Sequence, residues 1–137
     1  MSNMLEDIKK AVCEENSRLL DNGLVILTEG NVSQISPDRK YFVIKPSGVQ
    51  YDKLTPEKMV VVHMSGKAVE GKFRPSSDTP THAELYRQFP HIGGIAHTHS
   101  PFATIFAQMR QPIPCYGTTH ADAFFGDVPV TRHLTEE

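Results

Sequence analysis

The 137 residues suffice for one compact domain with a single core but are short for two, so we expect one domain over residues 1–137. A hydrophobic fraction of 39% and a charged fraction of 22% are ordinary for a folded, soluble protein and exclude a disordered chain. The net charge of -2 excludes the basic surface of a nucleic-acid-binding protein, and no run of about 18 apolar residues is present to cross a membrane.

The start of the chain does not resemble a secretion signal. Glu6 and Asp7 are acidic where such a signal is basic and then apolar. Cys13 and Cys115 are the only cysteines, and they lack the C-x-x-C spacing of a redox or structural zinc motif. We therefore expect buried, free thiols and a cytoplasmic location.

The first half of the chain predicts one helix followed by short strands. Apolar residues recur at helical spacing from Leu5 to Leu20, and Gly23 follows where the helix would stop. Strand-forming residues then fill short segments, at residues 24–28, 32–35, 41–44, 59–62 and 67–71. The turn-forming tetrad Ser36–Arg39 predicts a hairpin, and Thr55-Pro56 predicts a short helical turn.

The second half repeats one signal, a capping residue followed by proline. Thr79-Pro80 predicts a helix that ends near Pro90, and Ser100-Pro101 predicts another helix. Between these helices, residues 93–99 predict a buried strand. The mixture of helices and strands indicates an α/β or α+β fold.

His97 and His99 stand at alternate positions of that predicted strand. Because alternate residues of a strand point to the same side, both imidazoles can face one metal ion. Two histidines near a strand end can equally be surface or structural residues. The pattern alone leaves both interpretations open.

Ser76, Ser77 and Asp78 supply two hydroxyls and a carboxylate just before a predicted helix. The unpaired N–H groups at the start of a helix favour anions, and a carboxylate with two imidazoles is a common ligand set for a catalytic metal. The alternative is that Ser77 or Asp78 only caps the helix.

Two glycine-containing turns combine polar side chains with backbone that can approach a ligand closely. They are Gly30-Asn31-Val32-Ser33 and Lys45-Pro46-Ser47-Gly48. Either turn can cradle a phosphate. Lys45 would add a positive charge, although a lone lysine near a turn is more often solvated.

Five motifs together carry a resemblance to a known family. They are Gly30–Ser33, Lys45–Gly48, Pro75–His82, His97–Ser100 and Thr118–Asp122. In their order and spacing the chain resembles the class II aldolase and adducin family, and within it the L-ribulose-5-phosphate 4-epimerases of arabinose catabolism. The resemblance implies a three-layer α/β/α fold with a central, largely antiparallel sheet flanked by helices. It also implies a homotetramer.

The resemblance assigns roles to individual positions. Metal ligands match Asp78, His97 and His99, with zinc as the expected ion and manganese as the alternative. Positions that bind the sugar phosphate match Gly30, Asn31, Ser47, Gly48, Ser76 and Ser77. Asp122 matches the epimerase residue that exchanges a proton with the substrate alkoxide.

The implied reaction inverts C4 of a pentulose phosphate, converting L-ribulose 5-phosphate to D-xylulose 5-phosphate. The C3–C4 bond breaks in a retro-aldol step, and the aldehyde adds back from its other face. Asp78, where aldolases usually carry glutamate, and Asp122 favour this over a class II sugar-phosphate aldolase. A non-catalytic scaffold like the adducin head is a further alternative, against which the metal-binding residue types weigh.

The chain ends at Glu137, whereas members of the family usually continue to a third histidine ligand and a catalytic tyrosine. Neither has a convincing match here. His133 follows Asp122 too soon to be equated with the third histidine ligand, which stays unassigned. We therefore expect a domain that is incomplete at its C-terminus, with weaker metal binding and turnover.

Overall fold

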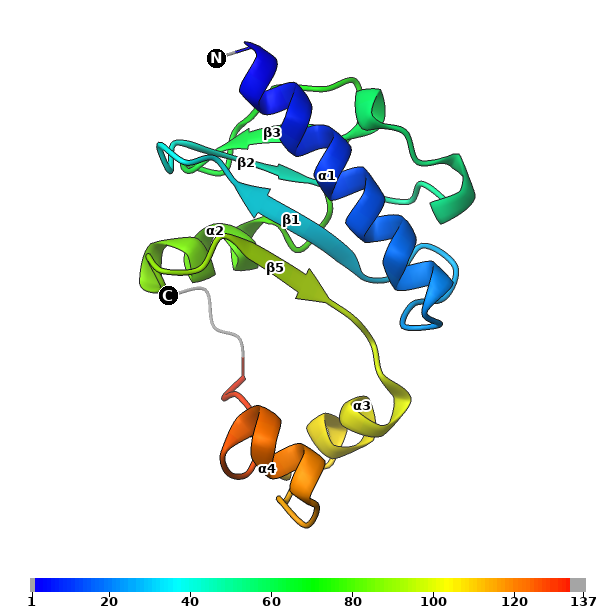
Figure 1. Cartoon of the computed structure of the whole chain (residues 1–137), viewed down its shortest axis with the longest axis vertical. Helices are drawn as coiled ribbons and strands as arrows, with labels where there is room; N and C mark the ends of the chain where they lie inside the picture. The colour runs from blue at the N-terminus through cyan, green and yellow to red at the C-terminus, as the bar shows by residue number, and fades with distance from the viewer. Residues whose placement is uncertain (1, 134–137) are drawn as a thin grey trace. The chain divides into compact units, whose positions relative to one another are not determined.

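A computed structural model describes residues 2–133 of the chain. The chain forms two compact units, of which the first ends at Thr98 and the second begins at His99. The first unit contains the sheet, and the second contains two short helices (Figure 1).

A five-stranded antiparallel sheet with the order β4-β3-β2-β1-β5 forms the centre of the first unit. Its strands are β1 (Asn31–Ile35), β2 (Tyr41–Ile44), β3 (Val60–His63), β4 (Ala68–Glu70) and β5 (Gly94–His97). The predicted hairpin is confirmed, since β1 pairs with β2. β5 pairs with the other edge of β1 and brings His97 opposite Asn31, which are far apart in the sequence.

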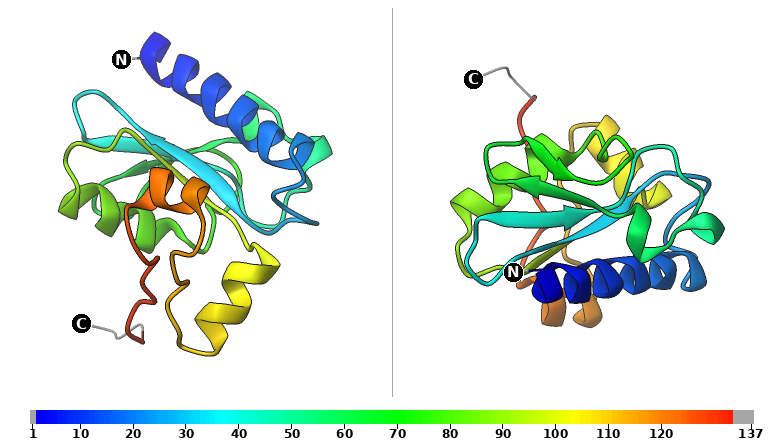
Figure 2. Two further views of the ribbon diagram at one scale, coloured as in Figure 1. Left: turned by 60° about the horizontal axis from the view of Figure 1, so that its bottom comes forward. Right: turned by 90° about the horizontal axis from the view of Figure 1, so that it is seen from above.

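One helix covers each face of this sheet, α1 (Ser2–Asp21) on one side and α2 (Thr79–Gln88) on the other (Figure 2). The pleat sends successive residues of β2 to opposite faces. Phe42 and Ile44 pack with Tyr86 of α2, whereas Val43 packs with Val12 of α1. The predicted three-layer α/β/α fold with a largely antiparallel sheet is therefore confirmed.

Residues 24–28 do not form the strand that their composition suggested. β1, the strand that follows this segment, already pairs with β2 and β5, so the segment cannot pair with β1. Ile26 and Leu27 are exposed, and Leu27 takes a positive φ of 53°, which interrupts an extended chain.

The predicted strand over residues 93–99 is shorter than expected and is not buried. β5 ends at His97, and its residues alternate between exposed and half-buried. The prediction of full burial was wrong because β5 pairs with β1 alone among the described strands.

The second unit contains α3 (Pro101–Gln108) and α4 (Thr118–Phe124). The helix predicted from Ser100-Pro101 is confirmed as α3. Ile113 and Val128 form an isolated antiparallel bridge. Across residues 2–133, none of the helices combines the length and apolar character needed to span a bilayer. Cys13 and Cys115 are both free thiols, Cys13 buried and Cys115 half-buried.

Candidate active site

The two loops predicted to bind phosphate, Lys45–Gly48 and Pro75–Asp78, lie side by side. The Ser47 N–H donates to the Arg74 carbonyl at 2.9 Å, and the Ser76 N–H donates to the Lys45 carbonyl at 3.1 Å. These backbone bonds link the end of β2 to the segment that leads into α2. Ser47, Gly48 and Ser77 are exposed on these loops and accessible to a ligand.

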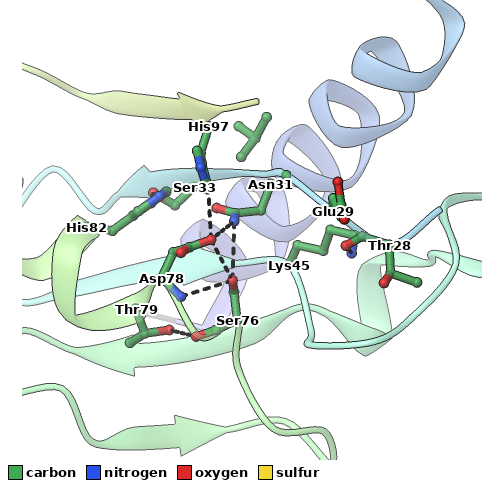
Figure 3. Close-up of polar contacts among 12 residues, drawn as sticks. Thr28, Glu29, Asn31, Ser33, Lys45, Ser76, Asp78, Thr79, His82 and His97 are labelled. Atoms are coloured by element: carbon green, nitrogen blue, oxygen red, sulfur yellow. Dashed lines mark hydrogen bonds and ion pairs between the residues drawn. The ribbon is translucent and has the colours of Figure 1, made fainter. Parts of the chain in front are cut away.

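A cluster of four polar side chains joins this loop pair to the sheet: Asn31, Ser76, Asp78 and His97 (Figure 3). Asn31 Nδ2 donates to Asp78 Oδ2 at 2.6 Å and to Ser76 Oγ at 3.2 Å. His97 Nδ1 lies 2.9 Å from the same Asp78 Oδ2. The pairing of Asn31 with His97 across β1 and β5 brings these residues together.

Asp78 is the centre of this cluster. Partial burial raises the pKa of its carboxyl, but hydrogen bonds from His97, Asn31 and Ser76 outweigh burial and leave the pKa below its ordinary value. Asp78 is therefore ionised at neutral pH and can only accept hydrogen bonds. The short contact then requires a proton of His97 to sit on Nδ1, so Nε2 is the ring atom through which this histidine would bind a metal ion.

The chemistry of the cluster fits a divalent cation. Carboxylate and imidazole are ligands that zinc and manganese accept. Asn31 Oδ1 is buried and has no hydrogen-bond partner among residues 2–133, and such an acceptor calls for a donor or a cation. Over residues 2–133, however, no group of three or more His, Cys, Asp or Glu side chains is placed to hold an ion. Among the described residues, the ligand types therefore suit a divalent metal ion, but fewer than three such side chains are placed to bind it.

Two predicted site residues, His99 and Asp122, belong to the second unit. His99 lies beyond the end of β5, so the alternation of a strand does not extend to it. Asp122 lies on α4 and is exposed, so its own unit does not supply the burial that acid–base chemistry calls for. The roles of His99 and Asp122 stay predictions.

The structure corrects the interpretation of Lys45 as a solvated side chain. Lys45 is only 2% exposed, its Nζ donates to the Thr28 carbonyl at 3.1 Å, and it lies 4.7 Å from the centre of the Tyr51 ring. Burial lowers the pKa of its ammonium group. No carboxylate within residues 2–133 forms an ion pair with it, so a bound anion would compensate a buried charge.

A second buried polar group went unrecognised in the sequence. Ser33 Oγ lies 2.7 Å from His82 Nδ1 and 2.8 Å from the Tyr86 hydroxyl, between β1 and α2. Burial lowers the pKa of His82 to about 4, so its ring is neutral in the folded protein. The one available signal in the sequence was that His82 follows Asp78 by four residues, about one helical turn. In the structure the His82 N–H donates to the Asp78 carbonyl at 2.9 Å.

The neutral His82 predicts a loss of stability in acid. Its ordinary pKa of 6.5 applies to the unfolded chain, and the folded value is about 4. Protons therefore bind the unfolded state more tightly than the folded state. The stability that the neutral His82 contributes is fully present above pH 6.5 and is lost as the pH falls toward 4. As the pH falls from 6.5 to 4, we expect the titration of His82 to reduce the free energy of unfolding by up to about 3 kcal/mol.

Urea unfolding between pH 7 and pH 4 measures this effect. The His82→Asn variant, whose side-chain amide can replace Nδ1 as the hydrogen-bond partner of Ser33, should show a shallower dependence on pH. The exposed His91, changed in the same way, is the matched control. Equal slopes for the wild type and the His82 variant would contradict the prediction.

The fold and the matches to solved structures define a class II aldolase fold. One solved L-fuculose 1-phosphate aldolase is 30% identical with a TM-score of 0.75, and the match covers 80% of this chain and 51% of that chain. The L-fuculose-1-phosphate aldolase from Thermus thermophilus is 27% identical with a TM-score of 0.75, covering 94% and 65%. The L-fuculose 1-phosphate aldolase from Glaciozyma antarctica shares the fold at 17% identity, with a TM-score of 0.76 and coverage of 88% and 50%.

The sequence profile of the Class II Aldolase and Adducin N-terminal domain family matches residues 10–137. The chain belongs to this family. It spans about half the length of the first of these solved relatives.

Proposed function

We propose that the chain carries the phosphate-binding loops and part of the metal site of a pentulose-phosphate 4-epimerase, which converts L-ribulose 5-phosphate to D-xylulose 5-phosphate. The single observation that carries the proposal is the 2.9 Å contact between Asp78 and His97 beside the unsatisfied Asn31 Oδ1. An ionised carboxylate that orients an imidazole is the usual support for a metal-binding histidine. The proposed ion is zinc, with manganese as the alternative, and His99 is a further proposed ligand.

The proposed substrate phosphate binds at the paired loops. Asn31 and Ser76 contribute polar side chains there. The exposed part of the two loops consists of Ser47, Gly48 and Ser77. Gly30, which precedes Asn31, is a further proposed phosphate-binding position. The buried charge of Lys45 provides the electrostatic attraction for a dianion.

The chain's own residues supply orientation and proton transfer. Asp78 accepts a hydrogen bond from Nδ1 of His97 and thereby fixes the orientation of the imidazole ring. Asp122 is proposed to exchange a proton with the substrate oxygen that becomes an alkoxide and then a carbonyl as the C3–C4 bond breaks. A bound divalent metal supplies Lewis-acid stabilisation of the negative charge that develops in this step. A cytoplasmic homotetramer is part of the same proposal.

The second candidate function is a class II sugar-phosphate aldolase. The solved L-fuculose-1-phosphate aldolases at 30% and 27% identity favour it. Aspartate rather than glutamate at position 78 favours the epimerase. The two candidates share the fold and metal chemistry and differ in whether the cleaved aldehyde is retained.

Product analysis separates the candidates. The chain is incubated with L-ribulose 5-phosphate and added zinc or manganese, and the products are followed by NMR. Formation of D-xylulose 5-phosphate that stops with a chelator supports the epimerase. Accumulation of glycolaldehyde phosphate and dihydroxyacetone indicates an aldolase. A protein that binds neither metal nor sugar phosphate would be a scaffold, and the proposal would be wrong.

A further inference from the structure

Three consecutive backbone carbonyls, of Thr28, Glu29 and Gly30, are held by only two side chains. The Tyr51 hydroxyl lies 2.8 Å from the Glu29 carbonyl oxygen and 2.9 Å from that of Gly30. Lys45 Nζ donates to the Thr28 carbonyl at 3.1 Å. These bonds hold the segment that leads into β1.

Tyr51 belongs to none of the motifs that predicted the site. It opens a short 3-10 helix, η1 (Tyr51–Lys53), and is 5% exposed. Its ring packs with Leu19, Val25 and Val32 between α1 and β1. Burial raises the pKa of its hydroxyl to about 12, so the group stays protonated and remains a donor.

The direction of these bonds determines where the following amides point. A peptide group is planar and trans, so its N–H points away from its C=O. When Tyr51 holds the carbonyls of Glu29 and Gly30, the N–H groups of Gly30 and Asn31 must face the opposite side. The register of β1 and β5 makes Asn31 and His97 a hydrogen-bonded pair, so the Asn31 N–H donates within the sheet and the Gly30 N–H is the one left for an anion. A backbone N–H oriented in this way attracts an anion.

Gly30 is enclosed on several sides, so its peptide groups have little freedom to rotate. Its φ is +74°, and an added Cβ would lie 2.7 Å from the His97 carbonyl oxygen and 2.7 Å from Val25 Cγ1. The same Cβ would lie 3.5 Å from the Tyr51 hydroxyl. The turn is thus fixed between the carbonyl of β5 and the tyrosine.

We propose that Tyr51 is a positioning residue for the phosphate-binding turn, because its hydroxyl sets the orientation of the Gly30 and Asn31 peptides. This inference rests on the proposed function, in which both residues bind the substrate phosphate. Tyr51 itself does not touch the substrate. Its contribution is to recognition of the phosphoryl group, without a part in bond cleavage.

The test is Tyr51→Phe, which removes one oxygen atom and keeps the ring under Lys45. We expect KM for the phosphorylated sugar to rise roughly tenfold, the effect of one lost hydrogen bond, with kcat within about twofold of the wild type. Affinity for inorganic phosphate, measured from ¹⁵N amide shifts of the folded protein, should fall by a similar factor. Binding of unphosphorylated L-ribulose should not change.

Tyr41→Phe is the matched control. Tyr41 is half-buried on β2, its ring contacts His63 at 5.5 Å between ring centres, and its hydroxyl makes no hydrogen bond to any residue between 2 and 133. It should bind phosphate as the wild type does.

The outcomes are distinguishable from failure of the proposed function. A wild type that does not prefer phosphorylated sugar overturns the proposed function itself. A wild type with that preference and a Tyr51→Phe variant that matches Tyr41→Phe overturns the role of Tyr51 alone. Equal loss for phosphorylated and unphosphorylated sugar, or a variant that does not fold, shows a structural role and also overturns it.

Discussion

Asp78→Asn should weaken zinc binding by about 10- to 100-fold, the usual effect of removing a carboxylate that orients a metal-binding histidine. The amide keeps the shape of the side chain but loses the charge that holds the Nδ1 proton of His97 at 2.9 Å. Competition with a chromogenic chelator measures the affinity. Asp7→Asn, an exposed change on α1, is the control and should bind zinc as the wild type does.

Cobalt substitution distinguishes the two roles that Asp78 can play. If Asp78 only orients His97, the visible absorption bands of bound Co²⁺ should keep their energies in the Asp78→Asn variant, because the atoms that coordinate the ion directly are unchanged. If Asp78 is itself a ligand, as the family resemblance implies, the bands should shift. Wild-type zinc affinity in the variant would show that the Asp78–His97 contact does not support metal binding.

Gly30→Ala should destabilise the first unit by about 3 kcal/mol or more. A side chain at φ +74° costs about 1–2 kcal/mol, and the added Cβ would lie 2.7 Å from the His97 carbonyl oxygen, which belongs to paired backbone and cannot move freely. The substitution therefore forces β5 away from the start of β1. Urea unfolding measures the loss.

Gly23→Ala is the matched control for this clash. Gly23 has a similar φ of +66°, but no atom of residues 2–133 would lie within 4 Å of an added Cβ, so only the conformational cost of about 1–2 kcal/mol applies. The difference between the two variants measures the cost of the contacts with the His97 carbonyl and the Val25 side chain. Equal losses would mean that the start of β1 adjusts and that Gly30 is not enclosed.

Much of the fold could be predicted because its signals are local. The spacing of apolar residues in α1, the turn at Ser36–Arg39 and the cap-and-proline pair at Thr79-Pro80 each act within a few residues. Each of these elements is present in the structure. The strand expected over residues 24–28 is absent, because strand-forming composition does not reveal whether a segment will lie beside a partner strand.

The site could be predicted only as separate motifs. Spacing and resemblance pointed to Asn31, Ser76, Asp78 and His97 individually, but nothing local indicated that the four share hydrogen bonds. Their contact depends on the pairing of β1 with β5, which joins segments distant in the chain.

The amino-acid sequence alone established the family's motifs and the main helices and strands of the first unit, since periodicity, caps and turns are properties of neighbouring residues. Only the tertiary structure decided the burial of Lys45 and the contacts of the Tyr51 hydroxyl with the carbonyls of Glu29 and Gly30. Both depend on which distant carbonyls and side chains surround a residue. A linear pattern of residue types does not contain that information.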